Sequence, residues 1–277
     1  MIIDTHVHIG NAIGKCMTKE MVIESMERYE IDFSLVSNLS SVEYDGDLNP
    51  IPMILQKSQL ASFEESIDFA RRHPDMIGIL PWIKPATERP DEDFWRLMEE
   101  NSDIVYGIKV HPFHSKTYFD SPKMESYIQL AQKFHIPVFS HTGGCEEAHP
   151  IHVYNMAVKY PDVNFVMVHM GLGTDNQEAI ELLGKAPNLY ADTTWVPISS
   201  IIEIVKNFGS DRVFFGSDNP IDGVDTYHHN PKGELSVYQQ YFNELERKIG
   251  SEHYQNIMYK NAMNVLGVKI KNRESLL

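Results

Sequence analysis

Residues 2–8 read Ile-Ile-Asp-Thr-His-Val-His, a short apolar run that ends in two histidines one residue apart. Because side chains alternate across a β-strand, His6 and His8 would share one face of such a strand. Seven more short apolar runs follow, and most of them end in a polar residue just before a turn. The eight runs are Ile2–His8, Phe33–Ser37, Met76–Ile83, Val105–His111, Ile136–His141, Asn164–His169, Leu189–Thr193 and Arg212–Asp218.

Longer stretches with apolar residues at helical spacing separate most of these runs. In Lys19–Tyr29, for example, Met21, Val22 and Met26 lie on one helical face. The other predicted helices are Ser62–His73, Pro122–Phe134, Ile151–Tyr160, Asp175–Lys185, Ile198–Asn207 and Glu234–Ile249. Strands that alternate with helices form right-handed βαβ units, and eight such units can close into a barrel. The sequence therefore predicts an α/β protein, a (β/α)8 TIM barrel in which residues 1–277 form a single domain.

The composition limits the class of protein. A chain of 277 residues suits such a barrel, which needs about 250. With 42% apolar and 23% charged residues the chain can bury a sizeable core, and a formal net charge of -15 argues against a nucleic-acid partner. No signal peptide and no apolar run of about 18 residues is found, so we expect no membrane partner. Cys16 and Cys145 are the only cysteines, which is typical of a cytoplasmic protein without a disulfide framework.

Three later runs end, like the first, in a side chain that can bind a metal ion. His141, His169 and Asp218 each stand at the tip of a hydrophobic run and are followed by a turn. The carboxyl ends of parallel barrel strands meet on one rim, where this fold builds its sites. Taken singly, a His-x-His pair could lie on the surface and Asp218 could cap a helix. Five such groups on one rim predict a metal site, for which imidazole suits zinc, iron, copper and nickel alike.

These segments resemble the amidohydrolase superfamily, and within it the amidohydrolase-related branch that includes aminocarboxymuconate semialdehyde decarboxylase and several lactone hydrolases. The matching segments are Ile3–His8, Gly107–Pro112, Val138–Gly143, Val168–Gly171, Phe215–Pro220 and Ile257–Gly267. The resemblance implies that His6, His8, His141 and Asp218 bind one divalent ion, with zinc expected. It also implies that His169 stays off the ion and, with Asp218, moves the proton of a metal-activated water.

Lys109 lies on the fourth run, and His111 is on the same face. Elsewhere in the superfamily a lysine of this strand is carboxylated and bridges two metal ions. In the branch that this chain resembles, an unmodified lysine can meet a carboxylate or carbonyl oxygen of the substrate as a cation. We favour the second role and count Lys109 among the catalytic residues. His111 could either contact the substrate or pack beside Pro112.

The function that these residues favour is metal-dependent hydrolysis of an amide, lactone or ester-like bond in a small molecule. The alternative on the same scaffold is a metal-dependent lyase, a decarboxylase or hydratase that acts on a small carboxylic acid. A third possibility is a metal-binding protein without catalysis, which the presence of both Asp218 and His169 disfavours. Dimers are common among proteins of this branch, which leaves a homodimer open.

Overall fold

The computed structural model of this protein describes residues 1–12, 14–221 and 237–270. The eight apolar runs are confirmed as eight parallel strands. They are β1 (Ile3–Ala12), β3 (Phe33–Asn38), β4 (Ile77–Ile79), β5 (Ile108–Val110), β6 (Val138–Gly143), β7 (Phe165–Leu172), β8 (Leu189–Asp192) and β9 (Val213–Phe214). The predicted α/β barrel is therefore confirmed, and the short β2 (Lys15–Met17) folds back antiparallel onto the end of β1.

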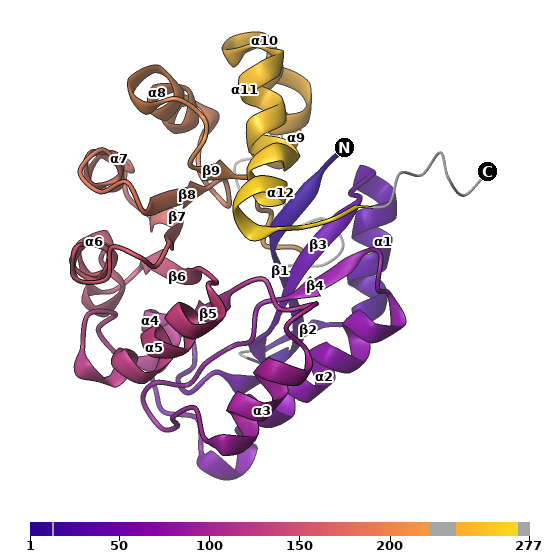
Figure 1. Cartoon of the computed structure of the whole chain (residues 1–277), viewed down its shortest axis with the longest axis vertical. Helices are drawn as coiled ribbons and strands as arrows, with labels where there is room; N and C mark the ends of the chain where they lie inside the picture. Colours follow the sequence, from indigo (N-terminus) through magenta and orange to yellow (C-terminus); the bar gives the residue numbers. More distant parts are fainter. Residues whose placement is uncertain (13, 222–236, 271–277) are drawn as a thin grey trace.

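The strands close into a barrel through single bridges between two sheets. One sheet has the order β2-β1-β3-β4 and the other β5-β6-β7-β8-β9. Parallel bridges join Ile79 to Val105 and Trp82 to Lys109, between the segments of β4 and β5. A further parallel bridge from Val7 to Asn219 joins β1 to the chain that follows β9. Figure 1 shows the strands around a common centre with the helices outside them.

Helices separate the strands, as the periodicity predicts. The larger ones are α1 (Lys19–Tyr29), α2 (Gln59–Arg72), α3 (Glu92–Glu100), α5 (Glu125–Phe134), α6 (Pro150–Lys159), α7 (Gln177–Leu183) and α8 (Ile198–Phe208). Shorter ones are α4 (Pro112–Ser115), α9 (Val237–Gln240), α10 (Glu246–Ile249), α11 (Ser251–Gln255) and α12 (Asn261–Leu266). Of the larger helices, α3 was not predicted, although the Asp91 side chain caps it and Phe94 and Met98 are buried one turn apart. None of the helices in the described part of the chain is long and apolar enough to be a membrane span.

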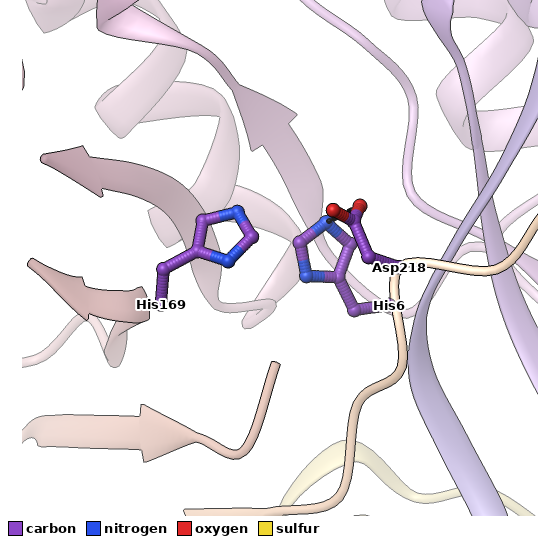
Figure 2. A group of neighbouring side chains, drawn as sticks. All are labelled: His6, His169 and Asp218. Carbon is purple, nitrogen blue, oxygen red and sulfur yellow. Dashed lines mark ion pairs between the residues drawn. The ribbon is translucent and has the colours of Figure 1, made fainter. Parts of the chain in front are cut away.

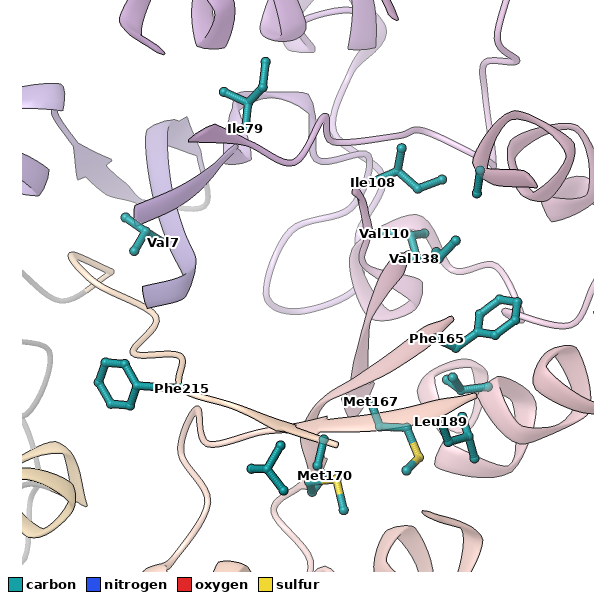
Figure 3. Packing of buried hydrophobic residues seen from close by; sticks show 14 of the residues in the cluster. Val7, Ile79, Ile108, Val110, Val138, Phe165, Met167, Met170, Leu189 and Phe215 are labelled. Atoms are coloured by element: carbon teal, nitrogen blue, oxygen red, sulfur yellow. The ribbon is translucent and has the colours of Figure 1, made fainter. Parts of the chain in front are cut away.

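Two apolar layers hold the barrel together. The larger lies between strands and helices, and Figure 3 shows Val7, Ile108 and Phe165 pointing away from the barrel axis. The smaller cluster fills the interior and includes Phe139 and Phe214. Their rings lie 6.3 Å apart although β6 and β9 are not neighbours in the sheet, so the two side chains meet across the barrel. Residues of α12 pack against this interior cluster.

A β-bulge in β1 turns the two histidines inward. The register between β1 and β3 shifts between Asp4 and Val7. In a regular strand Ile3 and Val7 would share a face, yet Ile3 belongs to the interior cluster and Val7 to the outer one. The extra residue reverses the alternation, so His6 and His8 face the inside of the barrel.

Because Phe139 fills the barrel beneath the site, we expect Phe139→Ala to lower the free energy of unfolding by about 3–5 kcal/mol. The ring is 1% exposed and contacts Phe214 across the interior, so its loss leaves a cavity. Urea denaturation measures the change. Val158→Ala on α6 is the control, since this side chain is 59% exposed and its removal should change stability by no more than about 0.5 kcal/mol. Equal effects of the two substitutions would contradict a filled barrel interior.

Candidate metal centre

A pocket of about 210 Å³ opens where the carboxyl ends of the strands meet. Six polar lining residues lie within the strands or shortly after them: His6, His8, His111, His141, His169 and Asp218. Leu39, Phe113, Leu172 and Ile221 contribute apolar side chains to the same pocket. All four residues predicted to bind the ion, together with His169, thus line one cavity although they come from opposite ends of the chain.

His6 is at the centre of the polar contacts. Its Nε2 atom lies 3.0 Å from His8 Nε2, 3.0 Å from Lys109 Nζ and 3.4 Å from Asp218 Oδ1. His8 Nε2 is also 3.0 Å from that Asp218 oxygen. If both rings carry their proton on Nδ1, the two Nε2 lone pairs and the Asp218 oxygen face one another here with no ring proton between them. A cation at this point would satisfy such lone pairs.

Three side chains each bring one ligand atom to within 4.8 Å of the others: His6, His169 and Asp218. Figure 2 shows the His169 ring facing His6 and Asp218 from the other side of the site. All three residues are buried. His8 adjoins this group through its contacts with His6 and Asp218. His169 therefore lies beside the candidate ligands, close enough either to bind an ion or to act next to one.

His141 stands at the edge of this group. Its ring centroid lies 4.7 Å from that of His169, and its face stacks on His111 at 3.7 Å and 16°. His141 Nε2 is 3.3 Å from the carbonyl oxygen of Gly143, whereas Nδ1 is buried and has no hydrogen-bond partner in the described part of the chain. A buried polar atom without a partner costs about 1–3 kcal/mol. An ion near this nitrogen would remove that cost, so the residues present fit a metal ion.

Burial sets the charge state of the site. It lowers the pKa of His169 to about 4 and holds the pKa of His6 well below its ordinary value. Burial also lowers the pKa of Lys109 to about 8, although Asp218 opposes the change. For Asp218 itself burial acts to raise the pKa, but His6 and His8 outweigh it and hold the pKa well below the usual range. At neutral pH His6 and His169 thus offer neutral imidazoles and Asp218 a carboxylate, the forms that bind a cation.

Asp192 is a buried carboxylate that was not among the site residues predicted from the sequence. Its Oδ2 lies 3.0 Å from His6 Nδ1, and its Oδ1 accepts a hydrogen bond of 2.8 Å from the backbone N–H of His169. Burial raises the pKa of Asp192, while the contacts with His169 and Thr194 lower it. Its position could have pointed to this role. Asp192 is the last residue of β8, and Asp218 likewise comes shortly after the end of β9.

Four further histidines that follow β5 and β6 divide into two groups. His111 and His114 line the pocket, and His114 Nδ1 lies 2.8 Å from the carbonyl oxygen of Tyr44 in the long segment that follows β3. That segment therefore reaches the pocket. His149 and His152 pair instead with Glu178 and Asp120 and do not line it. Of the chain that follows β9, residues 222–236 lie outside the described part of the structure.

Solved structures of similar fold cover nearly the whole chain. A 5-carboxyvanillate decarboxylase from Novosphingobium aromaticivorans, with bound manganese, has a TM-score of 0.72 at 11% identity and covers 97% of each chain. A protein described as a probable 2-pyrone-4,6-dicarboxylic acid hydrolase from Acinetobacter baumannii has a TM-score of 0.63 at 14% identity, over 96% of this chain and 99% of its own. An uncharacterized TIM-barrel protein from Bordetella bronchiseptica has a TM-score of 0.67 at 18% identity, over 96% and 98%.

At such identities these structures support the fold alone. No curated protein matches the sequence. The family model described as amidohydrolase matches residues 3–268, a span that includes every residue of the candidate metal centre. The resemblance seen in the sequence is thereby confirmed, and the chain belongs to the amidohydrolase family of enzymes.

Proposed function

We propose that the protein is a metal-dependent hydrolase that cleaves an amide, lactone or ester-like bond of a small molecule. His6, His8, His141 and Asp218 would hold one divalent ion, with zinc as the expected metal. The observation that carries the proposal is the convergence of imidazole nitrogens on Asp218 Oδ1, in the pocket that His141, with its unpartnered Nδ1 atom, also lines. When bound, the ion supplies Lewis acidity, which lowers the pKa of water and polarises a carbonyl group.

Asp218 and His169 would move the protons of the reaction. The low pKa of Asp218 keeps it ionised, so Oδ1 can accept a proton from the attacking water and return it to the leaving group. His169 is neutral at pH 7, and its ring lies beside His6 and His141. It can therefore orient the water as a hydrogen-bond partner without adding a competing positive charge. Lys109, which is buried beside His6, would meet an oxygen of the substrate as an unmodified cation.

The apolar part of the pocket favours hydrolysis over decarboxylation. Leu39, Phe113, Leu172 and Ile221 suit an uncharged substrate, and the lining contains no arginine among the described residues. Lys84, a candidate cation in the loop after β4, is buried away from the pocket and bonded to Gln56 and Glu88. A lyase remains the second candidate, because Lys109 Nζ, 3.0 Å from Nε2 of the pocket residue His6, could still seat a single carboxylate.

One screen separates the two functions. The protein, loaded with one equivalent of Zn²⁺ or Mn²⁺, is incubated with neutral lactones, esters and amides and with hydroxybenzoic acids. We expect acid release from a neutral substrate, followed with a pH indicator, and no carbon dioxide from the aromatic acids. Carbon dioxide release without hydrolysis would replace our proposal by the lyase. Metal analysis of the same preparation should give one ion per chain.

A further inference from the structure

We propose that the four residues Asp192–Trp195, which end and follow β8, act as the positioning segment of the site. On the side away from the pocket, this segment contacts His6, His169 and Asp218, the three side chains whose ligand atoms lie within 4.8 Å of one another. It determines which atom of each side chain is free to face the pocket. The inference deepens the proposed function and rests on it.

The first contact selects the tautomer of His6. Its Nδ1 atom lies 3.0 Å from Asp192 Oδ2 and 3.1 Å from Thr194 Oγ1. The Thr194 hydroxyl donates its own proton to Asp192 Oδ2 at 2.8 Å, so its oxygen is left to accept from His6. Both neighbours of Nδ1 are therefore acceptors, and the ring proton sits on Nδ1. Nε2 is left as a lone pair that points towards His8 and Asp218.

The second contact does the same for His169. Its Nδ1 atom lies 3.1 Å from the backbone carbonyl oxygen of Thr194, which can only accept a hydrogen bond. Its backbone N–H donates to Asp192 Oδ1 at 2.8 Å. The ring proton is thus on Nδ1 here too, and Nε2 is unprotonated. Asp192 thus contacts both strands that carry these histidines: Oδ2 contacts the His6 ring of β1, and Oδ1 accepts from the His169 backbone of β7.

The third contact orients Asp218. The indole Nε1–H of Trp195 donates to Asp218 Oδ2 at 2.8 Å. Because Oδ2 is held in this way, Oδ1 is the oxygen that faces His6 and His8, at 3.4 and 3.0 Å. A carboxylate on a short side chain rotates freely unless one oxygen is held. Trp195 thereby holds Oδ2 of Asp218 and leaves Oδ1 available for an ion or a proton.

The backbone of the segment is held against β9 in a conformation that its residues rarely adopt. Trp195 has φ +58° and its partner Asp218 has φ +69°, both in the left-handed region that non-glycine residues avoid. Thr193 Oγ1 and the Gly216 backbone exchange two hydrogen bonds of 3.0 Å. A Cβ atom at Gly216 would lie 2.5 Å from Thr194 Oγ1 and 2.9 Å from His6 Cβ. This close approach leaves the segment little room to move, and such strained conformations persist where the surroundings over-determine them.

The test uses two substitutions that alter hydrogen bonds of the segment. Trp195→Phe removes the indole N–H together with part of the ring, and Asp192→Asn can replace an acceptor at His6 Nδ1 by a donor. We expect the dissociation constant for Mn²⁺, measured by electron paramagnetic resonance, to rise about 10-fold in Trp195→Phe and about 100-fold in Asp192→Asn. The control is Trp95→Phe on α3, whose ring packs against Phe134 away from the site, and it should bind Mn²⁺ within about twofold of wild type.

A second measurement does not depend on metal binding. Long-range ¹H–¹⁵N spectra of the metal-free protein report which nitrogen of each histidine carries the proton. We expect unprotonated Nε2 atoms at His6 and His169 in wild type, and a change of the His6 tautomer in Asp192→Asn. A protonated His6 Nε2 in wild type, or wild-type Mn²⁺ affinity in a folded Trp195→Phe, overturns the positioning segment. If wild type binds no Mn²⁺ yet shows the expected tautomers, the metal proposal fails while the positioning segment stands.

Discussion

Dialysis against a strong chelator is expected to abolish hydrolysis, and one equivalent of Zn²⁺ or Mn²⁺ is expected to restore it. The described polar side chains of the pocket are imidazoles and one carboxylate, and none of them is a serine or cysteine nucleophile. Neutral histidines with low pKa values, such as His169, polarise a carbonyl group weakly. The ion would supply that polarisation, worth several kcal/mol, so its loss should lower kcat/KM by at least about 10³-fold.

The control for this experiment is the same chelator saturated with Zn²⁺ beforehand, which should leave activity unchanged. Circular dichroism should show that the metal-free protein keeps its fold, because both apolar clusters are built without the pocket residues. Full activity of protein shown by elemental analysis to be free of metal would refute the proposed chemistry. Unfolding on metal removal would instead make the ion structural, and the activity loss would then say nothing about catalysis.

The strands could be predicted from the sequence because each is a short apolar run that ends at a turn. Burial on both faces makes a parallel strand almost continuously apolar, and the run Phe165–Leu172 illustrates this. Helix α3, in contrast, was not predicted because its apolar pattern is short. It has only nine residues, and its acidic ends leave a short apolar pattern around Phe94 and Met98.

The residues of the candidate site could be named, but their surroundings could not. Alternation alone does not say which face of β1 carries His6 and His8, because the bulge between Asp4 and Val7 reverses the faces. The bulge depends on pairing with β3 and leaves no local mark in the sequence. No pattern in the sequence assigns a partner to Trp195, whereas in the structure its indole N–H donates a hydrogen bond to Asp218. Contacts of this kind join segments that are far apart in the chain, and no local pattern encodes them.

Asp218→Asn is expected to lower kcat by about 10³- to 10⁴-fold at saturating metal, the contribution typical of a positioned general acid–base group. The asparagine has nearly the same shape, so the hydrogen bond from Trp195 and the backbone N–H contact with the His6 carbonyl oxygen can persist. What is lost is the negative charge. A neutral amide can neither accept a proton from water nor balance a cation, although its oxygen can still coordinate weakly.

The Asp218→Asn substitution affects both proton transfer and metal binding. The metal content of the variant distinguishes the two effects. If the variant holds one ion per chain at high Zn²⁺ concentration but stays inactive, the loss belongs to proton transfer. If activity returns as Zn²⁺ is raised, the carboxylate serves mainly to bind the ion. Asp162→Asn is the matched control, since it removes the same charge from an exposed surface position and should leave kcat unchanged. An Asp218→Asn variant with wild-type kcat and wild-type metal affinity would remove Asp218 from the mechanism, because nothing else at this position could supply either the charge or the base.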